Sequence, residues 1–241
     1  MYDKIEEINL PNDAPSALLK DEHIHIVRKD VKQCLRRIAW LDTQRNKCFE
    51  FITKRFDVKE DGTKRAQDDF ASLAGRTPQT HGEHYKYMGS YLGLYELMKR
   101  HVPTYKIESP KLFRLILFNY LFSNGDAHFK NFSLLETPMG DYTLSPAYDL
   151  LNSRIHVADS YFALEDGLLP KNLAKGKIRE QFYILAAQAQ ISESQMNGIF
   201  GLLTSSPPKV NELIDASFLN ELTKQNYLQA YQTRLNKLIR V

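Results

Sequence analysis

The residues best suited to chemistry stand together in the segment "FSNGDAHFKNF", residues 122–132. An aspartate, a histidine, a lysine and an asparagine follow directly on the apolar run "LFRLILFNYLF"; they are Asp126, His128, Lys130 and Asn131. Two interpretations fit this pattern: a solvated turn that closes a core helix, or the floor of an active site. The segments on either side bear on the choice.

A second carboxylate is expected close to this segment. Asp126 and Asn131 are five residues apart, and Asp149 follows a predicted hairpin that begins at Asn131. Because a hairpin returns the chain to its own starting point, we expect Asp149 beside Asn131. One carboxylate is then free to orient a hydroxyl, while an amide and a carboxylate share a divalent cation such as Mg²⁺. This pattern is typical of phosphoryl transfer, where positioning and charge neutralisation supply most of the catalysis.

The elements that must position these residues are mostly helical. The apolar run predicts a helix that begins at Ser109 as N-cap, has Pro110 at its first position and stops at Asn124-Gly125. Because this helix is apolar almost all round, we expect it to be buried. Further helices are predicted over 67–75, 84–102, 175–190, 192–205, 207–217 and 219–240, and a hairpin over 131–136 and 141–146. The predicted fold is therefore mainly α (α+β) with small β-hairpins.

Two side-chain patterns in the predicted helices favour structural roles. Tyrosines of the 84–102 stretch, Tyr87 among them, recur at helical spacing, which indicates core packing rather than a binding stripe. His81 and His84 have a spacing that a metal on a helix could use, but Gly82 separates them and a surface turn is favoured.

Composition excludes several classes of protein. The formal net charge of +3 is too small to indicate nucleic-acid binding by itself. Cys34 and Cys48 lack metal-binding spacing and read as reduced thiols of a cytoplasmic protein. No apolar run approaches the roughly 20 residues that a bilayer requires, and the acidic N-terminus is not a signal peptide. We expect a cytoplasmic protein without membrane contact.

The string "NGDAHFKNFSLL…YTLSPAYDLLNS", residues 124–153, resembles the HipA-like serine/threonine kinases, the toxins of bacterial HipBA-type toxin–antitoxin modules. The D-x-H-x-K-N loop, the hairpin and the P-x-Y-D segment stand in family order. "FITKRFD", residues 51–57, looks like the family's hinge segment that borders the adenine. The resemblance covers residues 50–241 and implies a protein-kinase-like C-terminal lobe of the HipA type.

The resemblance implies a role for each residue of the loop. Asp126 resembles the catalytic base that orients the substrate hydroxyl, and Asn131 and Asp149 resemble the magnesium ligands. Lys130 is expected near the transferred phosphate, and His128 is expected to brace the loop.

The resemblance also implies a nucleotide and partners. Lys54, Arg55 and Phe56 match the hinge, where backbone groups meet the adenine of ATP, so the implied cofactors are ATP and Mg²⁺. The implied substrate is a protein hydroxyl, with aminoacyl-tRNA synthetases as the substrate class. The implied partner is a HipB-like helix-turn-helix antitoxin, through which DNA is touched only indirectly.

The segment before the hinge departs from the family pattern. Residues 1–61 contain no glycine, whereas the family places a glycine-rich loop and a lysine over the ATP phosphates there. We therefore expect an atypical segment over 1–49, a truncated or replaced N-terminal lobe, followed by a HipA-like C-terminal kinase domain over 50–241. Within the first 56 residues, 37–42 and 47–56 read as two strands.

Three functions stay open at this point. One is a kinase that is impaired because the phosphate loop and its lysine are absent. The second is a catalytically inactive remnant that acts as an antitoxin-binding module. The third is direct DNA binding through the basic stretch 26–37, for which a solvated face is the favoured alternative.

Overall fold

The structure, a computed structural model, describes residues 55–155, 160–205, 207–217 and 219–239. It divides the chain into two compact units, Met1–Arg65 and Ala66–Val241. The boundary predicted between residues 49 and 50 and the strand predicted over 37–42 lie outside the described residues. The same holds for the strand over 47–56 except at residues 55 and 56, which are not in a strand. In the described part of the first unit, Val58 and Lys64 form an antiparallel bridge.

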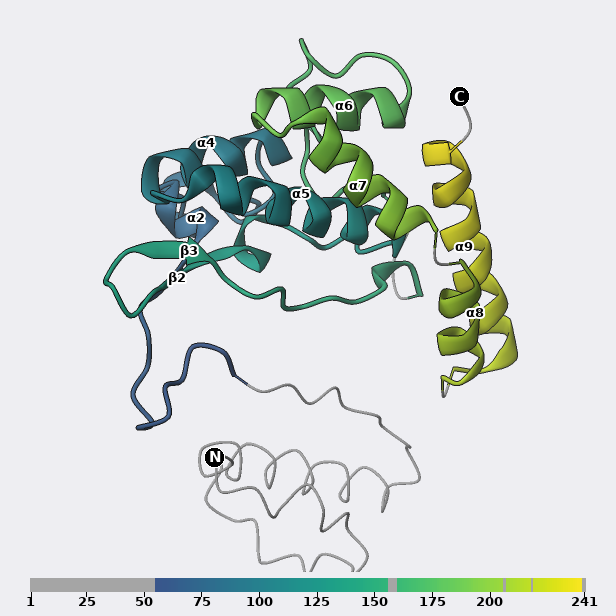
Figure 1. The fold of residues 1–241 in the computed structure, drawn as a ribbon, viewed down its shortest axis with the longest axis horizontal. Helices are drawn as coiled ribbons and strands as arrows, with labels where there is room; N and C mark the ends of the chain where they lie inside the picture. Colours follow the sequence, from purple (N-terminus) through teal and green to yellow (C-terminus); the bar gives the residue numbers. More distant parts are fainter. Residues whose placement is uncertain (1–54, 156–159, 206, 218, 240–241) are drawn as a thin grey trace, which may run out of the picture. The chain divides into compact units, whose positions relative to one another are not determined.

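The second unit is mainly helical, which confirms the predicted fold class (Figure 1). Its helices are α2 (Phe70–Leu73), α3 (Pro78–His81), α4 (Tyr91–His101), α5 (Tyr105–Leu121), α6 (Ile178–Gln188), α7 (Glu193–Thr204), α8 (Pro207–Asp215) and α9 (Glu221–Ile239), with short 3-10 turns η3 (Phe129–Asn131) and η4 (Ser153–Ile155). All four helices predicted after residue 170 are present. Among the residues that the structure describes, no helix is both long and apolar enough to cross a membrane.

A small antiparallel sheet of three strands supports the loop and contains one strand that the sequence did not predict. The predicted hairpin is present as β2 (Ser133–Glu136) and β3 (Tyr142–Leu144), with Leu135 opposite Thr143. The third strand, β1 (Gln67–Asp69), pairs with β2 on its other edge. The helix predicted over 67–75 was therefore wrong at its start, because backbone pairing with β2 decides the conformation of a polar sequence with little preference for strands.

Helix α5 is the central element, as its apolar sequence predicted. It contacts α4, α7, α9 and β3, and most of its side chains are buried, Phe113 and Leu117 completely (Figure 1). Its predicted start was wrong: the helix begins at Tyr105, and Pro110 lies inside it. Pro110 stands in the second turn, where it removes one backbone hydrogen bond of the helix.

Helix α4 also begins later than its sequence pattern predicted. The helix starts at Tyr91, so Tyr87 lies in a segment of turns before it. Gly89 has a φ of 84°, a left-handed conformation that ends any helical path through this segment, and Ser90 occupies the N-cap position. The tyrosine spacing that indicated one continuous stripe therefore spans two different structures.

Helix α9 is fastened to the core by a buried guanidinium. Arg234 is almost completely buried and donates hydrogen bonds to the carbonyl oxygens of Tyr120 at 2.6 Å and Ser160 at 3.0 Å. Its guanidinium also lies over the ring of Tyr120. The last helix is thus joined to the end of α5 and to the segment that approaches the loop of residues 122–128.

Candidate active site

The loop that carries Asp126 leaves α5 through a left-handed turn at Ser123, whose φ is 57°. The N–H of Asn124 then donates to the carbonyl of Asn119 at 2.9 Å, which closes the helix. The sequence placed the stop at Asn124-Gly125, but Gly125 does not adopt a positive φ. The lack of a side chain at Gly125 instead allows a close approach of another segment.

At Gly125 the loop meets the first residue of η4, Ser153. A Cβ on Gly125 would lie 2.9 Å from the Ser153 Oγ, closer than real side chains allow. At this approach the N–H of Gly125 donates to the Ser153 Oγ at 2.7 Å, and the N–H of Ser153 donates to the carbonyl of Ser123 at 3.1 Å. The segment that follows Asp149 is therefore attached directly to the loop.

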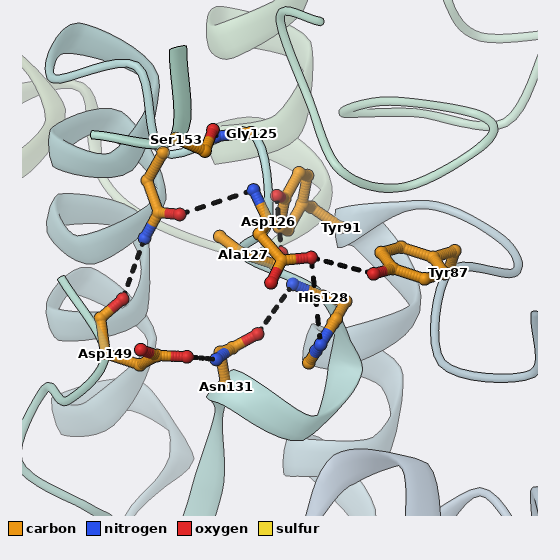
Figure 2. Close-up of polar contacts among 10 residues, drawn as sticks. Tyr87, Tyr91, Gly125, Asp126, Ala127, His128, Asn131, Asp149 and Ser153 are labelled. Carbon is orange, nitrogen blue, oxygen red and sulfur yellow. Dashed lines mark hydrogen bonds and ion pairs between the residues drawn. The ribbon is translucent and has the colours of Figure 1, made fainter. Parts of the chain in front are cut away.

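Asp126 stands at the centre of the site, half-exposed (Figure 2). Its Oδ1 accepts a hydrogen bond from the Tyr87 hydroxyl at 2.8 Å, and the His128 Nε2 lies 3.9 Å from the same oxygen. Within the described residues no hydrogen bond to Oδ2 occurs. One carboxylate oxygen is thus held by the protein, and the other is left for a further group.

Asn131 and Asp149 lie side by side, as the hairpin predicted (Figure 2). The Asn131 Nδ2 donates to the Asp149 Oδ2, while the Asn131 Oδ1 accepts the backbone N–H of His128 at 3.0 Å. Asp149 is exposed and has a φ of 56°, a left-handed conformation that an aspartate adopts less readily than glycine. The side chain of Asn131 is buried, so the pair has one fixed member and one open to solvent.

A single buried amide joins the segments of both carboxylates. The Asn124 Oδ1 accepts the backbone N–H of Asp126 at 3.3 Å, and its Nδ2 donates to the carbonyl of Asp149 at 3.0 Å. The same Nδ2 also donates to the Asn119 Oδ1 on α5 at 3.2 Å. One side chain, which is itself bonded to the central helix, therefore adds a direct link between the segments of the two acidic residues.

The His128 imidazole is neutral at neutral pH. Burial lowers its pKa below the ordinary value, and the charge of Lys86 acts in the same direction, although Asp126 opposes them. At 3.9 Å the contact between His128 and Asp126 is longer than a hydrogen bond, so it is a packing contact rather than an ion pair. The His128 Nδ1 is buried without a hydrogen-bond partner in the described part of the chain.

The Lys130 ammonium forms an ion pair with Asp69, the last residue of β1. Its Nζ donates to the Asp69 Oδ2 at 2.9 Å, and this hydrogen bond raises the pKa of Lys130. The carbonyl of Lys130 accepts the Tyr148 hydroxyl at 2.8 Å. A role of Lys130 near a phosphate stays a prediction and requires the ion pair with Asp69 to open.

The three residues of the predicted hinge are not placed at this site. Lys54 lies outside the described residues, and Arg55 and Phe56 belong to the first unit, which is separate from the unit that holds Asp126. Within that unit the Arg55 guanidinium pairs with Asp57, whose pKa it lowers. Their contact with adenine stays a prediction.

The donor set at Asn131 and Asp149 fits a hard cation that keeps much of its own shell. The part of the chain that the structure describes contains no group of three or more histidine, cysteine or acidic side chains that could hold a metal. An amide oxygen and a carboxylate leave most positions to water and phosphate, the shell that Mg²⁺ prefers. The Asn131 Oδ1 has a second lone pair beside the one that accepts the N–H of His128, and the Nδ2 bond to Asp149 must open for both side chains to face one cation.

Sequence reasoning missed three side chains of the site: Tyr87, Asn124 and Ser153. Tyr87 was assigned to a core stripe, and Asn124 to a helix stop. The signal that could have found Asn124 and Ser153 is their position at the two ends of the string "NGDAHFKN…YDLLNS". The signal for Tyr87 is the pair Gly89 and Ser90, a helix-breaking residue and an N-cap residue, which together indicate that the helix begins only after them.

Comparison with known proteins identifies the lineage. The sequence model of the HipA-like C-terminal domain matches residues 23–210. The protein called "Putative kinase Y4dM" from Sinorhizobium fredii is 32% identical over 143 residues, 58% of this chain and 32% of that protein. A Haemophilus influenzae protein called "Putative kinase" is 24% identical over 125 residues, 48% of this chain and 34% of that protein. The chain thus spans about a third of the length of the curated relatives it matches.

A solved structure shows the same fold. The HipA toxin–antitoxin complex of Shewanella oneidensis with HipB and its operator DNA gives a TM-score of 0.51 at 20% identity, covering 78% of this chain and 47% of that one. The helical unit with its loop and hairpin is therefore a kinase-like lobe of the HipA type. The chain belongs to the HipA-like C-terminal domain family.

Proposed function

We propose that the unit over 66–241 is a phosphoryl-transfer lobe that uses ATP and Mg²⁺ to phosphorylate a serine or threonine hydroxyl of a protein. The observation that carries this proposal is the geometry of one loop. It presents a half-exposed Asp126 carboxylate with one oxygen lacking a partner among the described residues, beside a neighbouring amide–carboxylate pair, Asn131 and Asp149.

In the proposed reaction each residue has one task. The Asp126 Oδ2 accepts the hydrogen bond of the substrate hydroxyl, orients its oxygen toward the γ-phosphorus of ATP, and takes the proton as the new O–P bond forms and the bond to ADP breaks. Asn131 and Asp149 hold the cation, which supplies charge neutralisation on the phosphates when bound. The buried Asn124 keeps the base and the cation site at a constant separation, because it bonds to the backbone of both segments.

We propose that turnover by this chain alone is weak. Residues 1–61 contain no glycine, the residue that lets backbone N–H groups approach phosphates closely in a phosphate-binding loop. Such a loop and its lysine act directly on the charge that develops in transfer, and loss of groups of this kind costs several kcal/mol, about 10²–10³ in rate for one donor.

The first test is nucleotide binding with a matched control. Calorimetric titration of the full chain with ATP and Mg²⁺ should give a binding signal that Asp149→Ala abolishes. Asp215→Ala removes the same charge from the exposed end of α8 and should leave binding unchanged. Equal binding in all three proteins would contradict the cation site.

The second test is phosphoryl transfer itself. Incubation with Mg-ATP and candidate protein substrates, aminoacyl-tRNA synthetases among them, should give phosphoserine or phosphothreonine by mass spectrometry. Asp126→Ala should abolish this signal. Transfer that is unaffected by Asp126→Ala would exclude the proposed base.

The glycine-free first segment favours a second candidate, a catalytically inactive module that docks a helix-turn-helix antitoxin and reaches DNA only through it. The Shewanella oneidensis relative was solved with HipB and operator DNA, which supports such a partner in the family. Co-purification with the product of a neighbouring antitoxin gene, without any phosphoryl transfer, is the expected result for this alternative.

A further inference from the structure

The hydroxyl of Tyr87 is the one protein group that donates a hydrogen bond to the Asp126 carboxylate within the described residues. The tyrosine comes from the turns before α4, far from the loop in sequence, and the reaction proposed above gives it no task. Its hydroxyl lies 2.8 Å from Oδ1. Burial and this hydrogen bond raise the pKa of Tyr87 to about 12, so the hydroxyl keeps its proton and donates at neutral pH.

Backbone hydrogen bonds and ring contacts hold Tyr87 in place. Its N–H donates to the carbonyl of His84 at 2.9 Å, and its carbonyl accepts the N–H of Glu165 at 3.0 Å. The ring packs edge-on against the His128 imidazole at 5.1 Å between centroids, and the Lys86 ammonium lies 4.9 Å from the ring centroid. The hydroxyl therefore has a defined position before any substrate arrives.

The two oxygens of Asp126 have different surroundings. Oδ1 receives the Tyr87 hydroxyl and faces His128, whereas Oδ2 has no hydrogen-bond partner among the described residues. The carboxylate is half-exposed, and the hydrogen bond from Tyr87 is the one that holds it within the described residues, so this bond is the contact best placed to restrict rotation about χ1. A hydrogen bond to a charged acceptor is stronger than one between neutral groups and restricts this rotation.

We propose that Tyr87 is a positioning residue that fixes the side-chain rotamer of Asp126 and so reserves Oδ2 for the substrate hydroxyl. The effect of Tyr87 on catalysis rests on the proposed function. The rotamer of Asp126 does not, because it can be measured on the protein without substrate. A different reading of the same contact is that the Tyr87 hydroxyl occupies the place of the substrate and blocks it. The open Oδ2 favours positioning, because a blocking hydroxyl would have to occupy the oxygen that the substrate needs.

The test uses the full chain and needs no activity. Three-bond couplings from the Asp126 Cγ to its backbone nitrogen and carbonyl carbon report χ1 by NMR. Wild type should show a single rotamer, and Tyr87→Phe, which removes only the hydroxyl, should show averaged couplings. The control is Tyr142→Phe on β3, whose hydroxyl has no hydrogen bond in the described part of the chain. It should leave the Asp126 couplings unchanged.

Two results would overturn the inference: averaged Asp126 couplings in wild type, or a single rotamer that persists in Tyr87→Phe. Where wild type transfers phosphate, Tyr87→Phe should lower kcat about ten- to a hundredfold, with KM for ATP nearly unchanged. A rise in kcat would instead identify Tyr87 as a block. Absence of transfer in wild type would reject the proposed function and leave the rotamer result standing, so the two failures are distinguishable.

Discussion

The contact between Gly125 and Ser153 makes a sharp prediction about stability. Because Gly125 does not have a positive φ, an alanine suits its backbone, and Gly125→Ala tests the closeness of the two segments alone. The new Cβ would lie 2.9 Å from the Ser153 Oγ, 3.3 Å from the Ser160 Oγ and 3.4 Å from the Ser160 carbonyl oxygen. To restore ordinary contact, Ser153 must move by about half an ångström.

The magnitude follows from how tightly Ser153 is held. Its Oγ accepts the N–H of Gly125 at 2.7 Å and donates to the Ser123 carbonyl at 3.2 Å, so the shift strains both bonds. Overpacking of this kind costs about 1–3 kcal/mol. The lower entropy of the unfolded alanine chain offsets about 0.4–1 kcal/mol of it. We expect Gly125→Ala to lower the free energy of unfolding by about 0.5–2 kcal/mol.

The assay is urea unfolding followed by circular dichroism, since the single tryptophan, Trp40, lies outside the described residues. Ser153→Ala removes the obstructing oxygen, so Gly125→Ala should cost less in that background than in wild type. Gly198→Ala on α7 is the control: its Cβ meets no atom within 4 Å, and the substitution should stabilise by about 0.5–1 kcal/mol. The steric reasoning would be refuted if Gly125→Ala were as stable as wild type. It would also be refuted if the stability changes of Gly125→Ala and Ser153→Ala simply added in the double variant.

Three further predictions concern the supports of the site. Lys130→Met should lower the free energy of unfolding by about 0.5–1 kcal/mol, less at high salt, because its ion pair with Asp69 is partly exposed; urea titrations at two salt concentrations measure this. His128→Gln should reduce the loss of stability as pH falls below 6.5. Below pH 6.5 the imidazole of the unfolded chain takes up a proton, whereas the folded imidazole does not, because its pKa is lowered. Urea midpoints measured above and below pH 6.5 test this difference. Arg234→Met should lower the free energy of unfolding by about 2–4 kcal/mol, because the buried carbonyl groups that Arg234 binds, such as that of Ser160, lose a charged donor. A thermal midpoint equal to that of wild type would contradict this.

The sequence was sufficient for the part of the site that local topology determines. Asp149 lies beside Asn131 because a hairpin of two short strands must bring its ends together, and this needs no knowledge of the rest of the chain. The helices were predictable where one apolar stripe runs between clear breakers, as in the four helices after residue 170. The buried character of α5 followed in the same way from an apolar surface almost all round.

The remainder depends on contacts between distant segments. β1 forms because β2 offers it a partner edge, although "QDD" has little preference for strands. The Tyr87 hydroxyl meets Asp126 across 39 residues, and Asn124 meets the carbonyl of Asp149 across 25. Helical periodicity carries no information about either contact, since Tyr87 lies outside α4 and Asn124 follows the end of α5.

The bridging amide of Asn124 has a consequence for how this lobe fluctuates. Its oxygen holds the N–H of Asp126 and its nitrogen holds the carbonyl of Asp149, so neither segment can detach without breaking the same side chain's contacts. Local opening should therefore be cooperative, and the backbone amides of Asp126 and Ser153 should exchange hydrogen with a common opening free energy. We then expect the two acidic groups to be presented together or lost together.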